Sequence, residues 1–323
     1  MFGSHLSIAG SMTNALHEAE SLKMDTVQVF TKNQQQWRVR PLDEAAIMDW
    51  KAEVGRLGWE GRVTAHASYL INLASPNDDL WAKSIDLMRV EVERCEQLAI
   101  PFLIHHPGSS TGAGSEFGIG RISKAYAKLF RSTRGFVTVC CLENTVGAGS
   151  TLGGPFEELA ALRERIVEAT GEADRVGYCI DTCHAHAAGY DLSTRKGAEE
   201  VLERLDATCG LGHVRALHLN DSKGAAGSHL DRHEHIGQGT IGGSTSPKAL
   251  ENSGFAAVVC RPEFRSIPKI LETPKGTDKA GTPYDTLNLR RLRKLSPRNV
   301  PISNGRRPVM TVPSATRRRR AKT

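Results

Sequence analysis

Five residues that can bind a metal ion or carry a proton recur at nearly equal steps of 40, 37, 38 and 37 residues: His66, His106, Glu143, Asp181 and His218. Four more residues of the same types lie beside or beyond this series: His184, Asp231, His233 and Glu272. Imidazole and carboxylate groups without thiolate favour Zn²⁺, with Mn²⁺ or Fe²⁺ as substitutes. Nine such groups are too many for one four-coordinate ion. They suffice for two or three ions if one carboxylate binds two neighbouring ions at once.

A cluster of this kind suits phosphoester hydrolysis. Metal ions about 3.5 to 4 Å apart lower the pKa of a bridging water and stabilise charge on the phosphate and on the leaving oxygen, so no side-chain nucleophile is needed. Each residue taken alone is explained as well by ordinary hydrogen bonding. Nine such groups buried together without a cation would be costly, and we therefore predict a metal centre. We leave six other histidines outside it: His17, His105, His186, His213, His229 and His235.

The cysteines allow a different interpretation of one segment. Cys179 and Cys183 lie beside His184 and His186, an arrangement that also fits half of a zinc finger. No second Cys/His pair follows at finger spacing, which disfavours this alternative. The chain has seven cysteines, an odd number, with no repeating framework, and we predict buried, reduced thiols.

Short β-rich segments alternate with helical patterns along the chain, and the metal-ligating types stand near the ends of these segments. Eight segments are predicted as strands: 3–8, 26–30, 62–68, 101–108, 136–145, 176–182, 214–221 and 267–274. One helix is expected to begin at Asp79, and another carries Pro155 in its first turn. Strict alternation predicts an α/β fold with a parallel sheet, and eight units favour a closed (β/α)8 TIM barrel. The strand ends of such a barrel converge on one face.

The charge is distributed unevenly. The net charge is +6, but twelve of the 42 Lys and Arg lie between Arg290 and the end, without any acid, so residues 1–289 carry 30 basic residues against 36 acidic ones. We predict a catalytic barrel over residues 1–295 and a disordered basic tail over 296–323. The tail suits nucleic acid or a nuclear import receptor, or it is solvated without a partner. No apolar stretch is long enough to span a membrane and no signal peptide is visible, so we expect a cytosolic or nuclear protein.

Seven segments resemble, in order, the motifs of the endonuclease IV family of apurinic/apyrimidinic endonucleases. They are FTKNQQQW (30–37), HASYLINLASP (66–76), HHPGS (105–109), LENTVGAGSTLG (142–153), CIDTCHAHAAGYDL (179–192), HLNDSKGAAGSHLDRHEHIGQGTIG (218–242) and ILETPKG (270–276). The resemblance covers residues 1 to about 295. It implies a TIM barrel with three zinc ions that cleaves DNA on the 5′ side of an abasic site. The products would be a 3′-hydroxyl and a 5′-deoxyribose phosphate, with a metal-bound hydroxide as the nucleophile.

The resemblance also implies a role for each ligand. His66 and His106 would hold one zinc ion, and Glu143 would bridge it to a second ion. The second ion would also take Asp181, His218 and Glu272, and the third would take His184, Asp231 and His233. Glu143 and Glu272 are the catalytic carboxylates in this scheme.

The implied partner is double-stranded DNA containing abasic sites, bound by a monomer in the bacterial nucleoid or the eukaryotic nucleus. Loops would enter the minor groove and hold the abasic nucleotide out of the stack, and Gln35, Tyr69 and Leu70 are the candidates for filling the gap. Gln35 stands where some members have arginine, so the inserted side chain would be uncharged. Ordinary packing beneath the loop is the alternative for Tyr69 and Leu70.

Two other functions fit parts of this pattern. A metal-dependent sugar isomerase on a related barrel would use one or two ions and fewer carboxylates. A non-catalytic DNA-binding barrel would not need the complete ligand set. The nine candidate ligands and the DRH segment (231–233) favour the nuclease over both. The segment 242–268 departs from the family pattern, since it is longer and more irregular than expected.

Overall fold

The computed structural model describes residues 1–296, so residues 297–323, which make up nearly all of the predicted tail, lie outside the described part of the chain. The barrel strands are β1 (Phe2–Leu6), β2 (Gln28–Phe30), β3 (Thr64–His66), β4 (Phe102–His105), β5 (Val139–Glu143), β6 (Val176–Asp181), β7 (Val214–His218) and β10 (Lys269–Leu271). Two further strands, β8 (Asp221–Ser222) and β9 (His233–Glu234), form a small antiparallel sheet.

Helices connect the strands. They are α1 (Met12–Ser21), α2 (Glu44–Leu57), α3 (Asp78–Gln97), α4 (Ser115–Ser132), α5 (Phe156–Thr170), α6 (Thr182–Ala187), α7 (Arg195–Cys209), α8 (Pro247–Glu251), α9 (Gly254–Cys260) and α10 (Tyr284–Leu295). Short 3₁₀ turns lie at Ala173–Arg175, Leu211–His213 and Pro262–Phe264.

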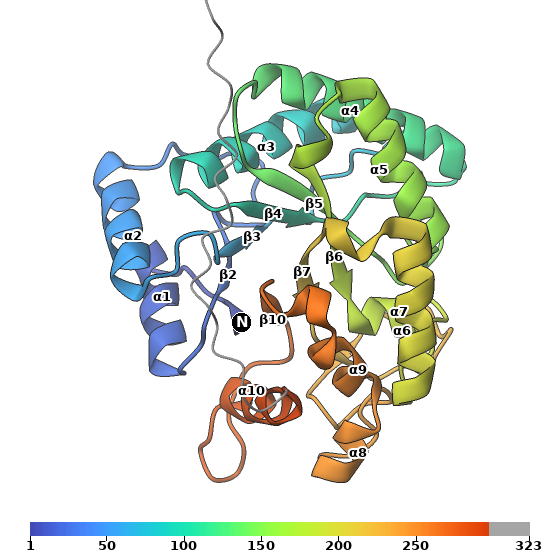
Figure 1. Cartoon of the computed structure of the whole chain (residues 1–323). Helices are drawn as coiled ribbons and strands as arrows, with labels where there is room; N and C mark the ends of the chain where they lie inside the picture. Colours follow the sequence, from blue (N-terminus) through green and yellow to red (C-terminus); the bar gives the residue numbers. More distant parts are fainter. Residues whose placement is uncertain (297–323) are drawn as a thin grey trace, which may run out of the picture.

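The strands close into a barrel in the order β1-β10-β7-β6-β5-β4-β3-β2, and neighbouring strands run parallel. The first and last barrel strands meet, with Phe2 opposite Lys269 and Ser4 opposite Leu271. Figure 1 shows the strands in the centre and the helices arranged around them. The C-terminal ends of the strands therefore share one face, which is where TIM-barrel enzymes carry their active sites.

The predicted TIM barrel is confirmed, and each of the eight predicted strands contributes one barrel strand. The strands are shorter than predicted; for example, segment 101–108 forms β4 only as far as His105, because the chain turns through Pro107 and Gly108, whose φ is +116°. The sequence did not predict β8 and β9. The segment 242–268 that departs from the family pattern contains two short helices, α8 and α9.

Helix ends follow local capping chemistry. α3 begins at Asp78, one residue before the predicted start, because the side chain of Asn77 accepts a hydrogen bond from the Leu80 amide at 2.8 Å. Pro155 is the residue before α5 rather than part of its first turn. Glu157 and Glu158 occupy that first turn, where carboxylates stabilise the helix dipole.

Apolar side chains pack on both sides of the barrel sheet. The larger core lies between strands and helices, and a small cluster of Ile104, Cys141, Cys179 and Ala216 fills the barrel interior. Side chains alternate across a strand, so the residue two positions after each of these four also faces inward. Those residues are His106, Glu143, Asp181 and His218. The pleat of four neighbouring strands therefore directs four candidate ligands to the same end of the interior.

All seven cysteines are free; six of them are buried, as predicted, and Cys260 is half-buried. Burial raises the pKa of the thiols that line the core, for example to about 12 for Cys140 and Cys179. These thiols pack as small apolar side chains. Among residues 1–296, no helix combines the length and the apolar character that crossing a bilayer requires.

Candidate metal centre

The nine candidate ligands converge at the C-terminal ends of the barrel strands. Their ligand atoms fall into three groups in which all members lie within 4.8 Å of one another. The groups are His66, His106 and Glu143; Glu143, Asp181, His218 and Glu272; and His184, Asp231 and His233. Glu143 belongs to two of them. The structure thus brings together all nine residues, in the same three sets that the resemblance implies.

Glu143 lies at the centre of the cluster and is completely buried. One carboxylate oxygen, Oε2, lies 3.1 Å from Nε2 of His66 and 3.2 Å from Nε2 of His106. The other oxygen, Oε1, lies 2.8 Å from Nδ1 of His218 and 3.5 Å from Nδ1 of His184. Because its two oxygens face different imidazoles, this carboxylate can serve two neighbouring cations at once.

Three imidazoles are oriented by backbone carbonyl groups. A carbonyl oxygen only accepts hydrogen bonds, so the nitrogen that faces it must carry the proton. Nδ1 of His66 donates to the Ala67 carbonyl at 2.7 Å, and Nδ1 of His184 donates to the Asn144 carbonyl at 2.9 Å. Nδ1 of His233 donates to a third carbonyl, that of Glu272, at 3.1 Å. Each ring therefore turns Nε2 toward the carboxylates, which is the arrangement that orients metal-binding histidines.

The spacing of Asp181 and His184 follows from a helix cap. Asp181 is the residue before α6, and its Oδ1 accepts a hydrogen bond from the His184 amide at 2.9 Å. Its other oxygen, Oδ2, accepts from Nδ2 of Asn220 at 2.7 Å and lies 3.8 Å from Nδ1 of His218. Asn144 fixes the same residue from the other side, because its Oδ1 accepts from the Asp181 amide at 2.7 Å.

Asp231 and the β9 residue His233 lie in the long segment between β7 and α8, which is organised by a buried carboxylate. The two oxygens of Asp221 accept hydrogen bonds from the amides of Gly237, Ile241 and Gly242 at 2.8 to 3.3 Å. A side chain on Gly242 would meet Asp221 Oδ2 at 2.7 Å, so this position requires glycine. Asp221 was not predicted from the sequence, although the glycines clustered after His235 are a sign of a tightly folded loop.

The buried carboxylates of the cluster stay ionised and stabilise positive charge on the groups beside them. Burial by itself would raise the pKa of Glu143, but His218 and His106 lower it well below its usual range. Burial likewise opposes the charged form of His184, yet the carboxylates of Asp181, Asp231 and Glu143 outweigh it and raise the pKa of this imidazole to about 10. The carboxylates therefore attract cations, whether these are protons on the imidazoles or metal ions.

The surroundings of one nitrogen of the cluster show that the residues fit a metal ion. Nε2 of His233 is buried and has no hydrogen-bond partner among the described residues. It lies 3.6 Å from Oδ1 of Asp231 and 3.6 Å from Oδ2 of Asp181. A nitrogen that faces two carboxylate oxygens without bonding to either is expected of residues that share a cation. The donor set of imidazole and carboxylate fits zinc and related divalent ions.

A thiol also lies near this part of the cluster. Cys183 forms a further group with Asp181 and His233. Its Sγ lies 3.7 Å from the Arg232 carbonyl, to which it donates, and burial raises its pKa to about 12. The protonated form is a poor metal ligand, so His184, Asp231 and His233 remain the better set.

Two further polar residues, on the first two strands, were not predicted as part of the site. His5 of β1 places Nδ1 3.1 Å from Oε1 of Glu272, and Gln28 of β2 donates from Nε2 to the same oxygen at 2.7 Å. Oε1 of Gln28 accepts from Nε2 of His218 at 2.9 Å. The signal that would have revealed Gln28 is a polar side chain at the start of a short strand, between the buried Val27 and Val29.

The other histidines are not part of the three groups. His17 is exposed, and His105 is buried with its Nε2 2.6 Å from the hydroxyl of Tyr126. His186 contacts Leu192 and Thr240 through its two nitrogens. His213, His229 and His235 likewise lie outside the groups found among the described residues.

The candidate DNA-contacting residues lie on two loops at the same face. Gln35 is exposed after β2, Leu70 is half-buried after β3, and Tyr69 is 60% exposed. The ring of Tyr69 lies 5.2 Å from the ring of His66 and 5.8 Å from that of His106. The ring of Tyr69 is therefore exposed beside two candidate metal-binding residues rather than packed beneath its loop.

A buried polar network supports both loops from below. Glu91 of α3 is 1% exposed and accepts hydrogen bonds from the Ser68 amide and the Thr31 hydroxyl, each at 3.1 Å. Its Oε1 also lies 3.6 Å from Nζ of Lys32. The hydroxyl of Ser68 donates to the Gln34 carbonyl at 2.5 Å. These contacts hold the loop after β2 and the loop after β3 in a fixed relation to one another.

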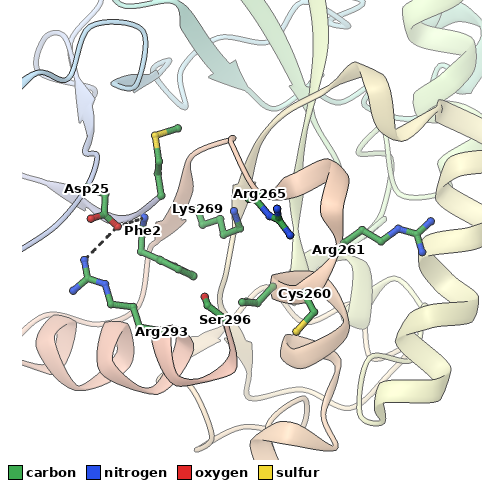
Figure 2. A pocket seen from close by; sticks show the side chains of 10 residues that line it. Phe2, Asp25, Cys260, Arg261, Arg265, Lys269, Arg293 and Ser296 are labelled. Carbon is green, nitrogen blue, oxygen red and sulfur yellow. Dashed lines mark hydrogen bonds and ion pairs between the residues drawn. The ribbon is translucent and has the colours of Figure 1, made fainter. Parts of the chain in front are cut away.

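A basic pocket lies at the opposite end of the barrel (Figure 2). Its volume is about 260 Å³, and its lining includes Phe2 and Lys269 at the N-terminal ends of β1 and β10. Asp25 accepts from the Phe2 amide at 2.9 Å and lies 3.4 Å from the guanidinium of Arg293, which ties α10 to the start of the barrel. Interactions at this end of a TIM barrel serve stability rather than catalysis.

The chain is similar to several known proteins. A family model described as "Xylose isomerase-like TIM barrel" matches residues 16–281. Probable endonuclease 4 from Chloroflexus aggregans is 42% identical over 294 residues, which are 91% of this chain and 97% of that protein. Probable endonuclease 4 from Geobacter sulfurreducens is 41% identical over 297 residues, covering 91% and 93%.

Solved structures give the same picture. The crystal structure of endonuclease IV from Thermus thermophilus matches with a TM-score of 0.76 and 34% identity, covering 91% of this chain and 98% of that chain. A D-tagatose 3-epimerase-like protein matches with a TM-score of 0.64 over 91% and 96%, but at 18% identity, so this likeness concerns the fold alone.

Proposed function

Because the chain belongs to the endonuclease IV family and is therefore a nuclease, we propose that it hydrolyses the phosphodiester bond 5′ to an abasic site in double-stranded DNA. The products would be a 3′-hydroxyl and a 5′-deoxyribose phosphate. The observation that carries this proposal is the convergence of nine imidazole and carboxylate groups in three sets, two of which share Glu143. A multinuclear site of this composition suits phosphodiester cleavage.

Three zinc ions fit the proposal best, with Mn²⁺ or Fe²⁺ as substitutes. His66 and His106 would hold the first ion, Asp181, His218 and Glu272 the second, and His184, Asp231 and His233 the third. Glu143 would join the first ion to the second. When bound, such ions provide an activated water and stabilise negative charge on the phosphate and the leaving oxygen.

The protein's own residues hold and position this centre. The carbonyls of Ala67, Asn144 and Glu272 keep a proton on Nδ1 of three imidazoles, so that Nε2, which faces the cluster, stays available as a metal ligand. These imidazoles are His66, His184 and His233. Burial of Glu143 keeps bulk water away from the bridging carboxylate. The protein therefore supplies an oriented, water-poor site in which electrostatic stabilisation is strong.

Recognition of the lesion is assigned to Gln35, Tyr69 and Leu70. An abasic site lacks one base, so turning its nucleotide out of the stack costs less than at an intact position. The exposed ring of Tyr69 and the partly exposed side chain of Leu70 would fill the gap, and Gln35 would do so without a charge. We propose that the protein acts as a monomer, in the compartment that holds the DNA.

The test is a cleavage assay on a duplex with a single abasic analogue, with an intact duplex of the same sequence as the control. We expect a nick 5′ to the lesion whose 3′ end can be extended by a DNA polymerase, and loss of activity after prolonged chelation. Metal analysis of the purified protein should find three ions per chain. Binding without cleavage would indicate a non-catalytic DNA-binding barrel, and turnover of a ketose would indicate a sugar isomerase. Either result would overturn the proposal.

A further inference from the structure

His218 differs from the other oriented imidazoles of the cluster in the group that fixes its ring. His66, His184 and His233 each donate to a backbone carbonyl. In His218 the ring nitrogen that points away from the cluster is Nε2, and it faces the side-chain oxygen of Gln28 at 2.9 Å. A backbone carbonyl stays in place whatever the side chain is, whereas this contact depends on one amino acid. A substitution of Gln28 would therefore remove the group that orients the ring of His218.

The amide of Gln28 can have only one orientation. Its Nε2 lies 2.7 Å from Oε1 of Glu272, and a carboxylate there requires a donor. Its Oε1 then accepts from Nε2 of His218 and from the Thr64 hydroxyl at 3.2 Å, which uses both of its lone pairs. The reversed amide would place an oxygen against the carboxylate of Glu272. The neighbouring strands support this position, since Gln28 pairs with His5 of β1 and with Thr64 of β3.

This arrangement determines which atoms face the cluster. With its proton on Nε2, His218 turns Nδ1 toward Oε1 of Glu143 at 2.8 Å and Oε2 of Glu272 at 3.1 Å. Asp181 Oδ2 lies 3.8 Å from the same nitrogen. Glu272, held through Oε1 by Gln28, directs its other oxygen inward. One amide side chain therefore orients two members of the four-residue group.

We propose that Gln28 is a positioning residue for the metal ion held by Glu143, Asp181, His218 and Glu272. It holds His218 in the form that offers Nδ1 and holds Glu272 so that Oε2 is free, and it touches neither the ion nor the DNA. This inference rests on the proposed metal centre. Replacing a residue that orients a ligand in this way typically lowers metal affinity by about 10- to 100-fold.

The first experiment compares two substitutions of similar shape. Gln28→Met keeps the length of the side chain but removes its hydrogen bonds to His218 and Glu272, together with its contacts to Thr64 and to Nδ1 of His5. Thr64→Val removes only the hydroxyl that donates to Gln28. Zinc affinity is measured by competition with a coloured chelator, and bound ions are counted by elemental analysis. We expect Gln28→Met to bind one of the ions about 10- to 100-fold more weakly. Thr64→Val should bind all ions like the parent protein.

These outcomes separate the inference from the proposed function. Equal zinc affinity of Gln28→Met and the parent would overturn the role of Gln28, while zinc binding by the parent would leave the metal centre intact. If the parent bound no zinc, the proposed metal centre itself would fail. A purely structural role would lower the thermal stability of the metal-free Gln28→Met protein without changing zinc affinity, and this result would also overturn the proposal.

A second experiment needs no variant. Nitrogen NMR of the zinc-loaded parent, labelled at histidine, distinguishes a metal-bound ring nitrogen from a protonated one. We expect His218 to be metal-bound at Nδ1 and protonated at Nε2, and His66, His184 and His233 to show the opposite pattern. A His218 ring bound to metal through Nε2 would overturn the proposal, because Gln28 could not then accept its proton.

Discussion

Replacing Glu143 with glutamine is the most direct test of how the cluster works. Glu143→Gln conserves the shape of a side chain that is completely buried, so the barrel should fold normally. The substitution removes one negative charge and replaces one carboxylate oxygen by an NH₂ group. Because Oε2 faces His66 and His106 while Oε1 faces His218, the loss affects two of the three ligand groups together.

The size of the effect follows from this double contact. Disturbing the surroundings of a single ligand costs about 10- to 100-fold in metal affinity or activity, and loss of the ligand itself costs at least as much. Applied to two ions, this gives a decrease in kcat/KM of about 10²- to 10⁴-fold, or about 3 to 5 kcal/mol in transition-state free energy. The number of bound ions should also fall.

The assay measures kcat/KM on a duplex with one abasic analogue, together with metal content and thermal unfolding. Glu91→Gln is the matched control, because it makes the same chemical change at another buried carboxylate. Glu91 accepts hydrogen bonds from Ser68 and Thr31, which begin the loops after β3 and β2. Its substitution should raise KM and leave metal content unchanged. Cleavage by Glu143→Gln at close to the parent rate would refute the bridging role of this carboxylate.

Three further predictions concern other parts of the molecule. Tyr69→Ala should raise KM for abasic DNA by about 5- to 150-fold without changing metal content, because stacking on an aromatic side chain is worth about 1 to 3 kcal/mol; an unchanged KM would remove Tyr69 from lesion recognition. Burial lowers the pKa of Lys269 from 10.5 to about 8, so between pH 8 and 10.5 the folded protein binds fewer protons than the unfolded chain and the free energy of unfolding rises with pH. Denaturant unfolding at pH 7 and pH 9.5 should show the parent gaining about 2 kcal/mol relative to Lys269→Met, and a constant difference between the two proteins would contradict the lowered pKa. Removal of residues 297–323, which contain eight Lys and Arg, should weaken DNA binding at low salt and leave the cleavage step unchanged; the same salt dependence with and without them would show that they do not contact DNA.

The fold could be predicted because each unit of the barrel carries its own local signal. Strands such as β5 and β6 are continuous apolar segments that end in a carboxylate, and helices such as α3 show a clear apolar face. The small sheet of β8 and β9 lacks such a signal, since each strand has only two residues. It forms because Asp221 gathers distant amides around one carboxylate, which is a tertiary effect.

The site was predictable to the extent that its residues repeat. The near-equal steps from His66 to His218 identified one ligand at the end of each of five strands, and the resemblance supplied the grouping. His5 and Gln28 lie outside this series, on the two strands that precede it, and His5 was overlooked although its residue type was right. Contacts such as Gln28 to His218 join residues 190 positions apart, and no local pattern encodes them.

The pairing of β1 with β10 has a consequence for how the protein is made. Ser4 and Leu271, which are joined across this seam by a hydrogen bond of 2.9 Å, lie 267 positions apart. A ribosome must therefore synthesise nearly all of residues 1–296 before the sheet can close, and until then both edges offer unpaired backbone groups to other chains. The candidate ligands extend from His66 to Glu272. The complete set of ligands would therefore come together only after nearly the whole barrel has been synthesised and has folded, so ions would bind stably after folding.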